Sequence, residues 1–124
     1  MSLFAVIREA GPSWTDGKGA FEQPAVNDHA AFMSSLADEG FVLFAGPLAG
    51  SEHDRIRALL IVETASEADV HRRLADDPWA REQRLVTTSV EPWTLFVGAE
   101  RLGAQPAPQE WFSGACGTAC RSSA

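Results

Sequence analysis

The fold is decided by a short apolar run in the middle of the chain, Phe41-Val42-Leu43-Phe44-Ala45, which is followed by Gly46-Pro47. A strand that packs on one side only alternates apolar and polar residues, and this run does not alternate. The apolar segments Leu3–Ile7 and Leu59–Val62 have the same character. We therefore expect strands that belong to a sheet with both faces buried.

Turn and capping signals place the other elements around this run. Asn27 or Asp28 is expected to cap the first helix and Gly40 to end it, while Ser66 caps a second helix. Pro78 is expected to start one further helical turn, with Asp77 as its N-cap. The expected strands are 3–8, 41–45, 56–63 and 85–97, with Pro92 at an edge or bulge, and the expected helices are 25–39 and 66–75. The Gly- and Pro-rich stretch 11–24 is expected to be irregular.

The order of elements is βαββαβ, which is the ferredoxin-like arrangement of the α+β class, a four-stranded antiparallel sheet with two helices on one face. Two helices cover only one face of such a sheet. The simplest cover for the second face is another copy of the chain, so we expect a homodimer whose two sheets close into an α/β barrel. Cover by the 11–24 loop or by the tail is the alternative. The domain is expected to span 1–98, and 99–124 to be a flexible tail.

Composition limits the class of function. A chain of 124 residues holds one core, and its net charge of −7 argues against nucleic acid and anionic membranes as partners. No apolar stretch approaches the roughly 20 residues of a membrane helix, and no secretory signal is visible, so a cytoplasmic protein is expected. Cys116 and Cys120 are expected to be reduced thiols in the tail, and no metal or cofactor is expected.

One histidine occupies a position where an apolar residue is expected. His29 shares a helical stripe with Phe32, Met33 and Leu36. A histidine at the edge of the core is one explanation, and a base for proton transfer is the other. A capping Asp77 has a second oxygen with which to orient such a histidine, although capping alone also explains that residue.

Four parts of the sequence together resemble the YCII-related family. They are the helix that carries His29, the run Gly40–Leu48, the triplet Asp77-Pro78-Trp79 and the segment Val90-Glu91-Pro92-Trp93. The resemblance covers about 3–97. It implies a dimeric α/β barrel similar to muconolactone isomerase and to the antibiotic-biosynthesis monooxygenase type. It also implies a histidine–aspartate active site, which falls here on His29 and Asp77.

The sequence thus favours a small cofactor-free enzyme that moves a proton on a small cyclic or aromatic molecule, in an isomerase- or lyase-like step. An oxygenase on the same fold is a variant. The alternative is a non-catalytic ligand-binding or accessory dimeric domain. A pocket is expected between the sheet and the first helix, with ligand contacts from Trp14, Phe44, Gly46, Pro47, Trp79 and Trp93. Packing in the core is an alternative explanation for Trp79 and Trp93. The end of a strand is an alternative explanation for Gly46-Pro47.

Overall fold

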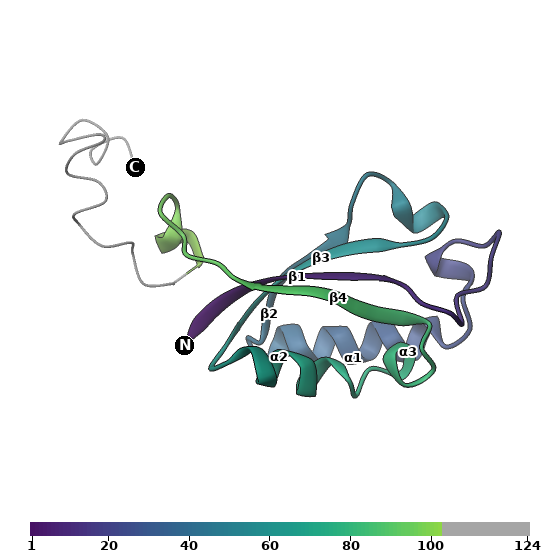
Figure 1. The fold of residues 1–124 in the computed structure, drawn as a ribbon, viewed down its shortest axis with the longest axis horizontal. Coiled ribbons are helices and arrows are strands. Elements are labelled where there is room, and N and C mark those ends of the chain that lie inside the picture. Colours follow the sequence, from purple (N-terminus) through teal and green to yellow (C-terminus); the bar gives the residue numbers. More distant parts are fainter. Residues whose placement is uncertain (103–124) are drawn as a thin grey trace. The chain divides into compact units, whose positions relative to one another are not determined.

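The structure is a computed structural model that describes residues 1–102. Residues Met1–Trp93 form one compact unit, and a second unit begins at Thr94. The first unit has the βαββαβ order predicted from the sequence, with one additional short helix (Figure 1). Its elements are β1 (Ser2–Ala10), α1 (Val26–Asp38), β2 (Val42–Pro47), β3 (Arg57–Thr64), α2 (Glu67–Leu74), α3 (Pro78–Arg81) and β4 (Leu85–Pro92). The α+β fold class is therefore confirmed.

The four strands form one antiparallel sheet in the order β2-β3-β1-β4. β4 is an edge strand and Pro92 is its last residue, as a proline without an N–H group requires. The predicted extension of this strand to Val97 was wrong, because the strand ends at Pro92. The β1–β4 register shifts between Ile7 and Arg8, so that Thr88 has no partner in the ladder.

The three helices cover one face of the sheet (Figure 1). The core lies between the helices and the sheet. β1 contributes Phe4 and Val6 to it, which are two positions apart as strand alternation requires. Leu36 of α1 and Val70 of α2 pack against them. The register places Ala5, Ile7, Phe44, Leu59 and Ile61 on the opposite face. Among these, the Phe44 side chain is 57% exposed, although the apolar run predicts a buried strand.

The helix ends show which capping signals were correct. Gly40 ends α1 as predicted. It has a φ of 83°, its N–H donates to Ala37 O and the Phe41 N–H donates to Leu36 O, and these two bonds form a Schellman motif. Ser66 caps α2 by accepting a hydrogen bond from the Asp69 N–H. The cap predicted at Asn27 or Asp28 was wrong. The N-cap of α1 is Ala25, the residue after Pro24. It has a φ of 60°, and its side chain makes no capping hydrogen bond.

The stretch 11–24 is irregular as predicted, apart from the single 3-10 turn η1 (Ala20–Glu22). It is nevertheless tied down, because the buried Gln23 amide donates to Thr15 O and Lys18 O and accepts from the Thr15 N–H. In the second unit, the described residues include the 3-10 turn η3 (Ala99–Leu102). Cys116 and Cys120 lie outside the described residues, and the predicted boundary at 98 stays a prediction. Among residues 1–102, no helix is long and apolar enough to cross a membrane.

Gly11 provides a test of how tightly this loop packs. A Cβ atom at Gly11 would lie 2.3 Å from Gln83 O and 2.9 Å from Val86 Cγ1. We expect Gly11→Ala to lower the free energy of unfolding by about 1–3 kcal/mol, because the backbone has to move apart. Gly46→Ala is the matched control, since nothing lies within 4 Å of its Cβ position. Urea unfolding measures both, and equal stability of the two variants would contradict the packing.

Candidate active site

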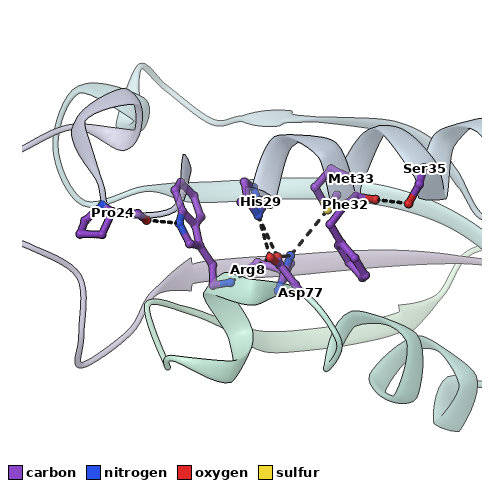
Figure 2. A network of polar contacts seen from close by, with 8 residues as sticks. Arg8, Pro24, His29, Phe32, Met33, Ser35 and Asp77 are labelled. Carbon is purple, nitrogen blue, oxygen red and sulfur yellow. Dashed lines mark hydrogen bonds and ion pairs between the residues drawn. The ribbon is translucent and has the colours of Figure 1, made fainter. Parts of the chain in front are cut away.

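Asp77 lies in the turn between α2 and α3, and its side chain is fully buried. It is the N-cap of α3, as predicted, and its Oδ1 accepts a hydrogen bond of 3.0 Å from the Trp79 N–H. Pro78 occupies the first helical position, where its missing N–H costs nothing. The local sequence therefore fixes the direction of the carboxylate, which points toward α1 and β1 (Figure 2).

The structure brings His29 and Asp77 together across 48 residues of sequence. His29 Nδ1 lies 2.8 Å from Asp77 Oδ2 and 3.0 Å from Oδ1 (Figure 2). An ionised carboxylate only accepts hydrogen bonds, so Nδ1 carries a proton, and in the neutral form of the ring the lone pair is on Nε2. Nε2 makes no hydrogen bond to residues 1–102, and the His29 side chain is 17% exposed.

Arg8 completes the cluster, and sequence reasoning missed it. The guanidinium is 1% exposed, and its Nη1 donates to Asp77 Oδ2 at 2.9 Å. Nη1 also lies 3.9 Å from Met33 Sδ (Figure 2). The available signal was strand alternation, because Arg8 follows Phe4 and Val6 on the face that packs against the helices. A cation at such a position needs a buried anion as its partner.

The charges explain the protonation of the cluster. Burial raises the pKa of the Asp77 carboxyl, but hydrogen bonding and charge from His29, the charge of Arg8 and the Trp79 N–H together lower that pKa below its ordinary value. Burial lowers the pKa of Arg8, and the charge and hydrogen bond of Asp77 oppose this effect. Asp77 is therefore a carboxylate at neutral pH, held between a guanidinium and an imidazole.

Trp79 packs against the His29 imidazole, and Trp14 packs against Trp79. The Trp79 ring is stacked on His29 with a centroid distance of 3.9 Å and an angle of 6°. The Trp79 indole N–H donates to Pro24 O at 2.7 Å, which joins α3 to the start of α1 (Figure 2). Trp14 meets Trp79 edge to face at 5.5 Å, and its indole N–H donates to Asp54 O. The 11–24 loop therefore latches onto the body of the protein through Trp14.

The other predicted ligand contacts are not joined to this cluster by any described contact. Phe44, Gly46 and Pro47 lie on the edge strand β2 and are exposed. Trp93 follows β4, where its N–H donates to Leu3 O and its side chain is 42% exposed. Their role in ligand binding stays a prediction, as does that of Trp14 and Trp79.

A hollow of about 500 Å³ lies elsewhere, between α2, α3 and β4. Its walls include Leu74, Ala80, Leu85 and Thr87, with His71 also lining it, and neither His29 nor Asp77 lines it. The predicted pocket beside the first helix thus stays a prediction. Within the part of the chain that the structure describes, no group of three or more His, Cys, Asp or Glu side chains is arranged to hold a metal ion.

Comparison with known proteins supports the fold. No family model matches the chain, and no curated protein sequence matches it. Among solved structures, the chain is similar to the 5-chloro-2-hydroxyhydroquinone dehydrochlorinase from Burkholderia phenoliruptrix, in complex with 2,5-dihydroxybenzoquinone. The identity is 20%, the match covers 79% of this chain and 97% of the other, and the TM-score is 0.50. This likeness confirms the fold class, and membership of the YCII-related family stays a prediction.

The buried charges make a prediction about acid stability. Because the pKa of Asp77 is lowered on folding, its contribution is present above the unfolded pKa of about 3.9 and is lost as the pH falls through the lower folded pKa. We expect Asp77→Asn to lose about 3–5 kcal/mol at pH 7, because Arg8 is left buried without its anion. Urea unfolding from pH 7 to pH 2 should show the difference from wild type shrinking below about pH 4.

The neighbouring Asp76 supplies the control for this experiment. Its side chain is 68% exposed, and among residues 1–102 it pairs only with the equally exposed Arg81. Asp76→Asn should therefore change the free energy of unfolding far less than Asp77→Asn. A loss of similar size in the two variants would contradict the special role of the buried carboxylate.

Proposed function

We propose that the protein is a small enzyme in which His29 moves a proton on a small cyclic or aromatic molecule, in an isomerase- or lyase-like step. The observation that carries this proposal is the 2.8 Å contact of His29 Nδ1 with a fully buried carboxylate, while Nε2 remains free and the ring is partly exposed. A neutral histidine held in one tautomer by a carboxylate is a general base. Asp77 is the positioning residue, because it touches the base and not the reacting molecule.

The surroundings of His29 suit the charge that this step creates. When Nε2 takes a proton, the imidazole becomes a cation that lies against the face of Trp79. An indole face attracts cations, and Asp77 Oδ1 and Oδ2 accept from the same ring. Both contacts are stronger with the imidazolium than with the neutral ring, so they favour the transition state over the ground state.

The structural neighbour supports the choice of substrate class. Its name describes loss of hydrogen and chloride from a hydroxylated aromatic ring, and it was solved with a dihydroxybenzoquinone. Removal of a proton from such a ring is a step that a histidine base performs. The proposal takes from this likeness the class of ring molecule only, and it assigns neither chloride loss nor that substrate to the present chain.

His29→Asn tests the base. The asparagine amide retains an N–H donor toward Asp77 but has no basic nitrogen in the position of Nε2. We expect turnover, or exchange of substrate hydrogen for deuterium followed by NMR, to fall by about 10²–10⁴-fold, while the fold is kept. His53→Asn is the control, because the His53 side chain is 81% exposed and Glu52 is its only ion-pair partner in the part of the chain that the structure describes. An unchanged rate in His29→Asn would refute the mechanism.

One observation favours the alternative of a non-catalytic binding or accessory domain. The Arg8–Asp77–His29 contacts cross-link β1, α1 and the turn before α3, so the cluster braces the fold whatever chemistry it performs. A pure brace predicts that His29→Asn lowers the melting temperature by several degrees and that no proton exchange is found in wild type. Retained stability together with lost exchange would reject this alternative.

We also propose that the chain forms a homodimer through the face of the sheet opposite the helices. Support comes from the apolar residues that the register places there, and from Phe44, whose side chain is 57% exposed. An apolar surface on a sheet is typical of an interface between subunits.

Phe44→Glu tests this interface. A charge within an apolar contact has to be desolvated, so we expect light scattering to show a dimer for wild type and a monomer for the variant. Phe21→Glu is the matched control, because Phe21 is 79% exposed but lies in the 3-10 turn η1 and outside the sheet. A monomer mass for wild type at micromolar concentration would refute the dimer.

A further inference from the structure

The Arg8 guanidinium has N–H donors that no residue in the described range 1–102 accepts from. Nη1 is occupied by Asp77 and lies against Met33. Nε and Nη2 are buried, and neither has a hydrogen-bond partner among residues 1–102. Buried polar groups in native proteins almost always have partners, so each exception calls for an explanation. For a guanidinium that remains charged, the missing partner is an acceptor and preferably an anion.

The identity of the two unused nitrogens is informative. The Nε–H and one N–H of Nη2 are parallel and lie on one edge of the planar guanidinium. This edge is the fork that binds both oxygens of a carboxylate, or two neighbouring oxygens on a ring. The edge that faces Asp77 contributes only Nη1 to the ion pair. The protein therefore uses the weaker, single contact for Asp77 and leaves the two-pronged edge unused.

The guanidinium that carries the unused fork shares a carboxylate with the proposed base. His29 Nδ1 and Arg8 Nη1 contact the same Asp77 Oδ2, at 2.8 Å and 2.9 Å. His29 is stacked on Trp79, and Arg8 lies in β1. The proposed base and the guanidinium therefore belong to one cluster, in which Asp77 links them. Met33 and Phe32 of α1 supply apolar side chains beside them (Figure 2).

We propose that Arg8 is the substrate-binding cation of this site, and that its Nε–Nη2 edge binds two adjacent oxygens of an anionic ligand. This inference rests on the proposed function, because it names the substrate class for the same base. The oxygens belong to a carboxylate or to neighbouring oxygens of a ring, such as those of a hydroxyquinone. A ring with a single hydroxyl group uses only half of the fork.

The charge balance agrees with this assignment. Before reaction Arg8 and Asp77 carry opposite charges, and the anionic ligand brings a negative charge of its own. When a proton moves from the substrate to His29 Nε2, its electron pair stays on the substrate and is delocalised onto an oxygen. The imidazolium and the new oxyanion then carry opposite charges as well, and Arg8 donates to that oxyanion. The proton transfer leaves the total charge of the site unchanged, and the negative charge on the ligand oxygens is the charge that the Arg8 donors attract.

Arg8→Lys separates this role from that of a structural ion pair. Lysine retains the positive charge opposite Asp77 but lacks the planar fork. The probes are 2,5-dihydroxybenzoquinone, benzoate and phenol, and calorimetry at pH 7.5 measures binding to wild type and variants. We expect the two-oxygen probe that binds wild type to bind Arg8→Lys about tenfold more weakly or worse, since hydrogen bonds to a charged donor are lost. Phenol should be affected much less.

Arg84→Lys is the matched control. Arg84 is a second largely buried arginine with a buried Nε that no described residue accepts from, and its side chain pairs with Glu82. The dissociation constants of the probes for Arg84→Lys should stay within twofold of those for wild type. Binding of the quinone alone identifies ring oxygens as the ligand group, and binding of benzoate alone identifies a carboxylate. Equal binding by Arg8→Lys and wild type, or no binding of either probe to wild type at millimolar concentration, would overturn the proposal.

A second measurement uses the wild-type chain and does not depend on the folding of a variant. In protein labelled with ¹⁵N-arginine, the Nε–H resonance of Arg8 should shift as the bound probe is titrated, while that of Arg84 should not. An Arg8 resonance that stays in place with saturating probe would contradict the contact. The binding test and the test of the base can be told apart, because His29→Asn is expected to lose proton exchange and still to bind the probes. Loss of exchange with no Arg8 effect would refute this inference alone.

Discussion

The Asp77 carboxylate is the contact on which the arrangement of the site depends. It accepts from the backbone of α3, from the guanidinium of Arg8 on β1 and from the imidazole of His29 on α1. Three elements that are distant in sequence are thereby joined at one fully buried group. A buried carboxylate is costly unless all its partners are present, and here every partner is supplied by the fold. The same contacts that keep Asp77 ionised also fix the tautomer of His29.

The β-bulge beside Arg8 shows how the sheet serves this site. The register of β1 and β4 shifts between Ile7 and Arg8, and Thr88 is the extra residue. The Thr88 hydroxyl donates to Ile7 O and to the Glu9 carboxylate, so the irregular segment is held at both sides of Arg8. Bulges change the direction of a strand locally and are frequent next to active sites. Here the bulge lies at the one residue of β1 that carries a buried charge.

Much of this fold could be predicted from the sequence, since its signals are local. The apolar runs gave the strands, Gly40 gave the end of α1, and Asp77-Pro78 gave the cap of α3. The start of α1 could not be predicted in this way. Ala25 adopts a positive φ without a side-chain cap, and the Pro24 carbonyl instead accepts from the Trp79 indole 55 residues away. This end of the helix is specified by tertiary contact, which no local pattern contains.

The site was predictable to the same extent and for the same reason. His29 was visible as a titratable residue on an apolar stripe, and Asp77 as a cap with an oxygen to spare. Arg8 was overlooked because a charged residue near the end of a strand is usually exposed, although alternation from Phe4 and Val6 placed it inside. Whether Arg8 is counted in the cluster changes the chemistry that the cluster can perform. A histidine and an aspartate alone form a base, whereas a base beside a rigid cation can both remove a proton and hold the anion that results.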